Sequence, residues 1–122
     1  MDVIFYAGSE KEVFTSFTEI PEDHILGGGT FTVDHISDLF DCVCNEAPRK
    51  SGNNWLSPNS FIERLSKASD EELMDLGPRW AEKKSWSGIE VNPFDLFGHI
   101  QEIKYNFLSI GNPKLRIWVL FE

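Results

Sequence analysis

The segment from Phe31 to Cys44, FTVDHISDLFDCVC, concentrates side chains that could do chemistry. It holds three aspartates, one histidine and two cysteines within fourteen residues. Such a set could ligate a metal ion, activate a nucleophile or present carboxylates to a partner. The same residues could also be the solvent-facing side of a helix, so their spacing has to decide between these interpretations.

The three aspartates of this segment share one flank of a helix. Asp34, Asp38 and Asp41 are spaced i, i+4, i+7, which puts their carboxylates in a row. Like charges at this spacing repel by about a few tenths of a kcal/mol per pair, and the segment contains no lysine or arginine to offset them. Two interpretations stay open: a soluble surface with Asp34 favoured near the helix N-terminus, or a docking face for a basic partner.

The spacing argues against a metal or nucleophile site. His35 and Cys42 are seven residues apart, so a rise of about 1.5 Å per residue separates them by roughly 10 Å, too far for a thiolate and histidine pair. Asp38 and Cys42 could hold zinc only with ligands from elsewhere, such as His24 or His99, and no HExxH or CxxC pattern is present. We therefore expect no catalytic residue, no metal and no cofactor.

Cysteine usage and the chain ends indicate the compartment. Residues two apart in a helix point away from each other, so a disulfide between Cys42 and Cys44 is geometrically poor. Two free thiols suit a reducing compartment, and the N-terminal residues lack the basic stretch of a secretory signal. The longest apolar run, Ile117 to Phe121, is too short to span a bilayer. We expect a cytoplasmic protein with no membrane partner.

Hydrophobic periodicity and capping signals predict the helices that position these residues. The segment from about Asp34 to Glu46 has one apolar stripe, and Thr32 or Asp34 could cap it. Capping or proline signals also predict helices that start after Ser57, Ser69 and Asn92. The helix after Ser69 is predicted to end at Gly77 and Pro78, and the helix after Asn92 is predicted to close at Gly111 and Pro113. A short helix is predicted from about Glu10 to Phe17, because Ser9 and Glu12 have capping-box spacing.

Strands are predicted at the two ends of the chain. Val3 to Ala7 and the stretch KLRIWVLFE are rich in β-branched and aromatic residues, and the second is apolar on both sides, as in the interior of a sheet. A third short strand is expected near Thr30 or Ile89, whereas TEIPEDHILGGGT and APRKSGNNW are predicted to be loops. The predicted fold is a single α+β domain over residues 1–122, with about four helices packed on a small sheet that includes both terminal strands.

The formal charge of −9 is distributed unevenly along the 122 residues. Up to Glu46 there are ten acidic residues and one base, Lys11, whereas acids and bases balance from Ala47 onward. If the first part of the chain is contiguous in space, it forms a negative lobe. In that case the following carboxylates would join the aspartate row: Glu19, Glu22 and Asp23.

A second feature combines tryptophans with bases in the stretch GPRWAEKKSWSG. Trp80 and Trp86 alternate with Arg79, Lys83 and Lys84, a combination that can bind single-stranded nucleic acid. A chain of net charge −9 is repelled by polyphosphate, so we do not expect nucleic-acid binding. The tryptophans are expected to close the core or to line a protein-binding surface.

A small acidic domain without catalytic signatures is similar in overall character to bacterial immunity proteins and other stoichiometric inhibitors of basic nucleases. The resemblance is one of composition, and it implies a protein-binding module, not an enzyme, that occludes a basic partner such as a nuclease toxin. Two alternatives remain: a small hydrolase or metal-dependent enzyme using His24, His35 or His99 with carboxylates, and an adaptor subunit that buries the region of Trp80 and Trp86 against another chain.

Overall fold

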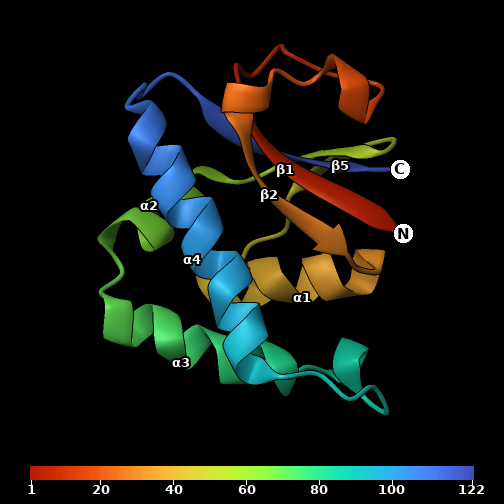
Figure 1. The fold of residues 1–122 in the computed structure, drawn as a ribbon, viewed down its shortest axis with the longest axis vertical. Helices are drawn as coiled ribbons and strands as arrows, with labels where there is room; N and C mark the ends of the chain where they lie inside the picture. Colours follow the sequence, from red (N-terminus) through yellow and green to blue (C-terminus); the bar gives the residue numbers. More distant parts are fainter.

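The computed structural model describes residues 1–122 as an antiparallel sheet with four α-helices (Figure 1). The strands are β1 (Asp2–Gly8), β2 (Ile25–Thr30), β3 (Arg49–Ser51), β4 (Asn54–Leu56) and β5 (Arg116–Phe121). The helices are α1 (Val33–Cys44), α2 (Asn59–Lys67), α3 (Asp70–Ala81) and α4 (Pro93–Ile110). Three short 3-10 turns are η1 (Phe17–Glu19), η2 (Glu22–His24) and η3 (Lys84–Trp86).

The sheet has the order β2-β1-β5-β4-β3, with every neighbouring pair antiparallel. The two terminal strands pair with each other, from Val3 opposite Phe121 to Gly8 opposite Arg116. The predicted α+β class, the pairing of the terminal strands and the interior position of β5 are therefore confirmed.

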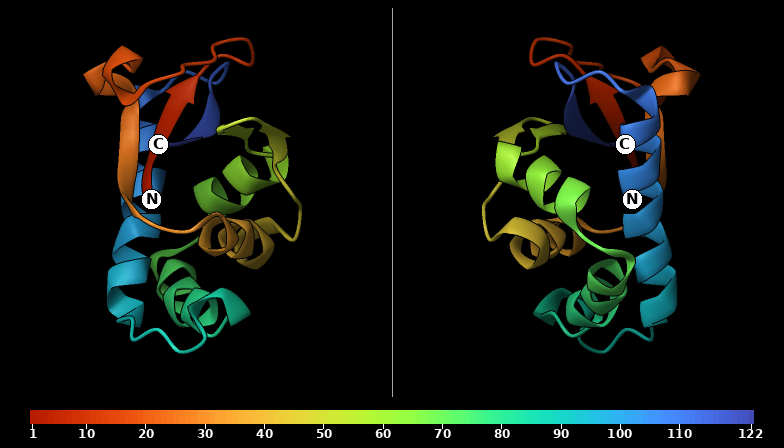
Figure 2. Two further views of the ribbon diagram at one scale, coloured as in Figure 1. Left: turned by 90° about the vertical axis from the view of Figure 1, so that its right-hand side faces the viewer. Right: turned by 90° about the vertical axis from the view of Figure 1, so that its left-hand side faces the viewer.

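The alternation of side chains along β1 and β5 divides the core into two parts. Val3, Phe5 and Ala7 point to the face that the helices cover, where they join the main apolar core. Tyr6 and Trp118 point to the opposite face, where residues of the connection between β1 and β2 cover them. Figure 2 shows the four helices gathered to one side of the sheet, with residues 9–24 over its upper end.

The predicted helix from Glu10 to Phe17 is wrong. The capping-box bond forms, since Ser9 N–H donates to Glu12 Oε1 at 3.2 Å, but the chain makes only turns up to η1. The backbone groups that a helix would use are bonded elsewhere: the Phe14 carbonyl accepts from Asn54 Nδ2 at 2.6 Å, and Phe17 N–H donates to Glu122. Phe14 also packs its ring against Tyr6, so tertiary contacts override the local signal.

The glycine-rich stretch predicted as a loop is the edge strand β2, and the predicted third strand near Thr30 is its end. Glycine is required here because a Cβ at position 28 would lie 2.6 Å from the Val3 carbonyl oxygen. A Cβ at position 27 would lie 3.0 Å from Glu102 Oε1 on α4, which packs along β2. The glycines thus let β2 fit between β1 and α4.

Helix α3 continues through Gly77 and Pro78, where the sequence predicted its end. A Cβ at Gly77 would collide with the Pro93 carbonyl oxygen and lie 3.0 Å from the Cβ of Phe97, so glycine allows α3 and α4 to approach closely. Pro78 is exposed, which places its ring and its missing N–H on the solvent side. Packing against α4 keeps the helix continuous despite both residues.

The polar break after α1 contains the hairpin of β3 and β4, which the sequence did not reveal. Ser51 pairs with Asn54 across a two-residue turn in which Gly52 has φ +58°. Three helix starts agree with expectation: Thr32 caps α1, Ser69 caps α3 and Asn92 caps α4 through side-chain hydrogen bonds. The start of α2 differs by one residue, because Pro58 and not Ser57 holds the N-cap position, without a side-chain hydrogen bond.

Candidate functional site

His35 is held at both ring nitrogens in the first turn of α1. Its Nδ1 accepts from Thr32 N–H at 3.1 Å, and Thr32 Oγ1 accepts from His35 N–H at 3.1 Å. The ring proton must then sit on Nε2, which donates to the Ser85 carbonyl at 3.0 Å. Burial lowers the pKa of His35, outweighing the Ser85 carbonyl, Asp34 and Asp38, which favour the protonated form. His35 is a structural, neutral imidazole.

Two of the three aspartates hold the same segment as His35. Asp38 Oδ2 accepts from Ser85 N–H at 3.2 Å, and Asp41 forms an ion pair with Lys83. These contacts fasten η3, which follows α3, onto α1. We call this arrangement the α1–η3 clasp. It consists of His35, Asp38 and Asp41 on α1, and of Lys83, Ser85 and Trp86 on the facing segment.

Trp80 and Trp86 complete this arrangement from the inside. Trp80 is 1% exposed and its indole N–H donates to the His35 carbonyl at 2.8 Å. Trp86 is 8% exposed and stacks on the His35 ring. Of the two interpretations for these tryptophans, core closure is what the structure shows, and neither has exposed area with which to line a docking surface.

The remaining predicted acidic residues lie at a different end of the molecule. Glu19, Glu22 and Asp23 are exposed in η1 and η2, and Glu19 accepts a hydrogen bond from Thr15 at 2.6 Å. Figure 1 shows residues 17–24 at the upper end of β2 and α1 at its lower end. Six strand residues span roughly 20 Å, so the negative lobe divides into two separate regions. Within α1, Asp34 alone is an exposed carboxylate without a bonded partner.

The other two histidines have different surroundings. His99 on α4 is half-buried and packs edge-to-face on Phe31 with ring centroids 5.1 Å apart. His24 ends η2, and its Nδ1 is buried without a hydrogen-bond partner. No histidine is hydrogen-bonded to a carboxylate, and no three side chains among His, Cys, Asp and Glu converge as metal ligands would.

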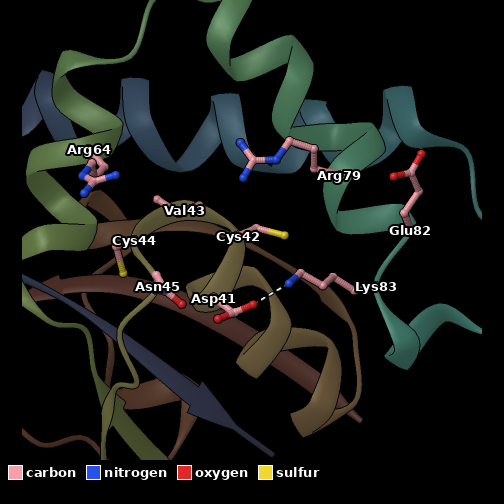
Figure 3. A pocket seen from close by; sticks show the side chains of 9 residues that line it. All are labelled: Asp41, Cys42, Val43, Cys44, Asn45, Arg64, Arg79, Glu82 and Lys83. Carbon is pink, nitrogen blue, oxygen red and sulfur yellow. Dashed lines mark hydrogen bonds and ion pairs between the residues drawn. The ribbon is translucent and has the colours of Figure 1, made fainter.

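The largest pocket lies where the C-terminal end of α1 meets α2 and α3 (Figure 3). It has a volume of about 600 Å³, and sequence reasoning missed it because its wall comes from three helices. Arg64 and Arg79 enter it without an ion-pair partner, while Lys83 is paired with Asp41 at its edge. Both arginines lie near the C-terminal ends of their helices, where cations are favoured.

The Cys42 thiol lines this pocket but is only 7% exposed. Burial raises the pKa of Cys42, and the positive charges of Lys83 and Arg79 oppose that shift without cancelling it. A nucleophilic cysteine needs the opposite, a lowered pKa with access to solvent. Cys44 is also buried, and its thiol donates to the Phe40 carbonyl at 3.3 Å, so both cysteines are free and structural.

A smaller groove of about 330 Å³ lies on the outer side of α3 and α4. It is mostly apolar and is lined by Met74, Pro78, Asn92, Pro93, Phe94 and Phe97. The sequence did not predict it, because the predicted end of α3 at Gly77 and Pro78 separated its two walls.

No helix combines the length and the apolar run that crossing a bilayer requires. No protein-family model matches the chain, and no curated protein or solved structure matches it either.

Proposed function

We propose that this chain is a small acidic protein-binding module that acts as a stoichiometric inhibitor of a basic partner, in the manner of an immunity protein. The observation that supports it is the small extent of internal neutralisation. Twenty acidic residues face eleven bases, yet ion pairs form only between Arg49 and Glu10, at 3.6 Å, and between Lys83 and Asp41. Most carboxylates are therefore free to attract a positively charged surface.

The proposed contact residues are four acidic groups of the first part of the chain that no internal cation neutralises. Asp34 at one end of β2, with Glu19, Glu22 and Asp23 at the other, would steer a basic protein and pair with its Lys or Arg side chains. Carboxylates in these positions would occupy the places where the bases of a nuclease otherwise hold phosphate. Inhibition would then be occlusion of the substrate-binding surface.

Asp38 and Asp41 have a different part in this proposal. Their carboxylates bind Ser85 N–H and Lys83, so they support the α1 surface instead of contacting the partner directly. Trp80 and Trp86 likewise shape the clasp from within the core.

The first experiment is capture of partners on the tagged chain at low salt, elution with rising salt and identification by mass spectrometry. A partner that fits the proposal is basic, is released by salt and, where it cleaves nucleic acid, is inhibited by one equivalent of this chain. If every captured protein is acidic, or is retained regardless of salt, the proposal is rejected.

Two variants of equal net charge then separate position from overall charge. The test variant carries Glu22→Gln, Asp23→Asn and Asp34→Asn. The control carries the same number of neutralisations at other exposed and unbonded positions, Glu63→Gln, Glu90→Gln and Glu102→Gln. Stopped-flow association should slow about tenfold more in the test variant than in the control, because local charge steers the encounter. Equal rates would remove these three residues from the proposed contact surface.

A further inference from the structure

We propose that the groove between α3 and α4 receives an apolar side chain from a basic segment of the partner protein. This inference rests on the proposed function and adds to it the anchor that long-range attraction lacks. None of the acidic contact residues of the proposed function lines the groove, so steering and anchoring would be done by different residues.

Two large apolar side chains at the groove are exposed and lie on facing helices. Met74 is 51% exposed and Phe94 is 66% exposed, while Phe97 below them is buried and packs against Phe94 with ring centroids 5.5 Å apart. Neighbouring apolar residues that remain exposed beside a concave, apolar surface are typical of interaction sites. Aromatic residues in such places contribute a large share of binding free energy.

The groove exists because the backbones of α3 and α4 are in contact at one end. Gly77 lies against Pro93, so nothing larger than a hydrogen atom separates the two helices there. Pro78 and Pro93 form the walls beside that contact, and neither carries a flexible side chain that could fill the groove. The site is therefore formed in the free protein and needs little reorganisation to bind.

The charges around the groove identify the partner chemistry. On α3, the exposed Glu71 lies one turn before Met74 on the same helix face, whereas Asp75 and Glu82 line the pockets on the side of α3 that faces α1 and α2. On α4, the exposed Asp95 directly follows Phe94. Each helix thus places one exposed carboxylate, Glu71 or Asp95, beside an apolar residue of the groove.

The adjacent base does not neutralise this rim. Arg79 follows Pro78 in the sequence, but Figure 3 shows its guanidinium directed into the pocket between α1, α2 and α3. A segment with one apolar residue between lysines or arginines therefore complements the groove in both shape and charge. A second copy of this chain does not, because docking two such rims would bring carboxylates against carboxylates.

The test is titration of ¹⁵N-labelled protein with three synthetic peptides, followed by amide NMR. The first peptide is lysine-rich with one central phenylalanine, the second has alanine in place of that phenylalanine, and the third is glutamate-rich with the phenylalanine retained. We expect shifts at Met74, Phe94 and Phe97 with the first peptide alone. No shift at these amides, or equal shifts with the third peptide, would overturn the proposal.

A matched pair of variants checks the anchor. Phe94→Ala should weaken binding of the first peptide about tenfold, whereas Leu108→Ala, which removes a similarly exposed apolar side chain far along α4, should leave affinity unchanged. Equal affinities of the two variants for the first peptide would contradict the proposal. So would a concentration-dependent dimer in sedimentation that Phe94→Ala abolishes, because a second copy would then occupy the groove. If no peptide binds at the groove, the proposed function still stands, provided that the acidic triple variant slows association with the captured partner. If the peptides do not bind and the triple variant associates at the control rate, the groove proposal and the proposed function are both rejected.

Discussion

The imidazole of His35 stacks on the indole of Trp86 with ring centroids 3.6 Å apart and planes inclined by 7°. The stack joins the first turn of α1 to η3, two elements fifty residues apart, and hydrogen bonds at both ring nitrogens fix the orientation of the imidazole. A side chain that looked available for chemistry in the sequence is thereby used for structure. The same holds for Asp38 and Asp41, which bind the same segment.

We expect acid to destabilise the protein through His35. Burial lowers its pKa in the folded state below the ordinary value of 6.5, so the unfolded state binds the proton more readily. The resulting stabilisation is fully present above that ordinary value and is lost as pH falls below it toward the folded-state pKa. Thermal unfolding between about pH 7.5 and pH 5.5 should show the melting temperature decreasing.

The variant His35→Gln should be less stable than the wild type at neutral pH, yet its melting temperature should depend less on pH over that interval. His99→Gln is the matched control, because His99 packs on the same Phe31 ring but has no bond to η3. If both variants keep the full wild-type pH dependence, the assignment to His35 is wrong.

Loss of the Asp38 carboxylate should weaken the clasp. Asp38→Ala leaves Ser85 N–H without its acceptor in a half-buried position, which should lower the free energy of unfolding by about 1–3 kcal/mol. Glu63→Ala, on the exposed side of α2 with no hydrogen bond, should change it by less than about 0.5 kcal/mol. Urea unfolding at pH 7 measures both, and equal effects would contradict the role given to Asp38.

The ion pair between Lys83 and Asp41 should contribute less than the Asp38 bond. Both side chains are partly exposed, so solvent screens their attraction. A double-mutant cycle with Lys83→Met and Asp41→Asn should give a coupling free energy below about 1 kcal/mol, decreasing with added salt. A larger, salt-independent coupling would mean that the pair is shielded from water.

Two helical glycines should respond to alanine with opposite signs. At Gly77 a Cβ collides with the Pro93 carbonyl, so Gly77→Ala should destabilise by about 1–3 kcal/mol or more. At Gly98 on α4 nothing lies within 4 Å of the added Cβ, so Gly98→Ala should stabilise by about 0.5–1 kcal/mol through helix propensity. Chemical denaturation of the two variants provides the comparison. A shared sign would refute the close approach of α3 and α4.

Sequence patterns predicted the elements whose signals are local. The apolar stripe with its cap located α1, the asparagine and proline start located α4, and the apolar run of β5 placed it inside the sheet. Where a long-range contact decides, the patterns failed. The glycines of β2 predict a loop when only the sequence is considered. In the structure they form a strand, because α4 and β1 leave no room for a Cβ there.

The candidate site was less predictable than the fold, for the same reason. Spacing placed Asp34, Asp38 and Asp41 on one flank of α1, which is correct, but it could not show that Lys83 and Ser85 lie opposite two of them. Charge neutralisation of a helix flank by another element is a tertiary property. The pocket at the end of α1 and the groove between α3 and α4 depend on helix packing, which periodicity alone does not define.

The two cysteines should react slowly with thiol reagents. Cys42 and Cys44 are buried, and the raised pKa of Cys42 keeps its thiol protonated at pH 8. Labelling by iodoacetamide should therefore be much slower than for a free thiol in water, and denaturant should restore the ordinary rate. Rapid labelling of Cys42 in the folded protein would instead indicate an open, reactive thiol in the pocket.

Alkaline pH should weaken the second part of the core through Tyr6. Its phenol is buried beneath the β1–β2 connection and donates to Asn54 Oδ1 at 2.8 Å. Burial raises the pKa of Tyr6 from 10.0 to about 12. A hydrogen bond with the Phe14 backbone lowers this pKa by less than burial raises it, and the charge of Glu12 adds to the increase. The folded state thus retains the proton more strongly. The associated stability is present below about pH 10 and is lost as pH rises toward 12.

Absorbance titration of tyrosinate in the Tyr105→Phe variant isolates Tyr6, because the chain has only two tyrosines. We expect a transition near pH 12, or a cooperative transition that coincides with unfolding monitored by circular dichroism. The Tyr6→Phe variant should lose the Asn54 bond, which lowers neutral-pH stability by about 1–3 kcal/mol, and should unfold at high pH with a shallower dependence. Ionisation of Tyr6 near pH 10 in the folded protein would show that water reaches the phenol, and the covering of the sheet by residues 9–24 would then need revision.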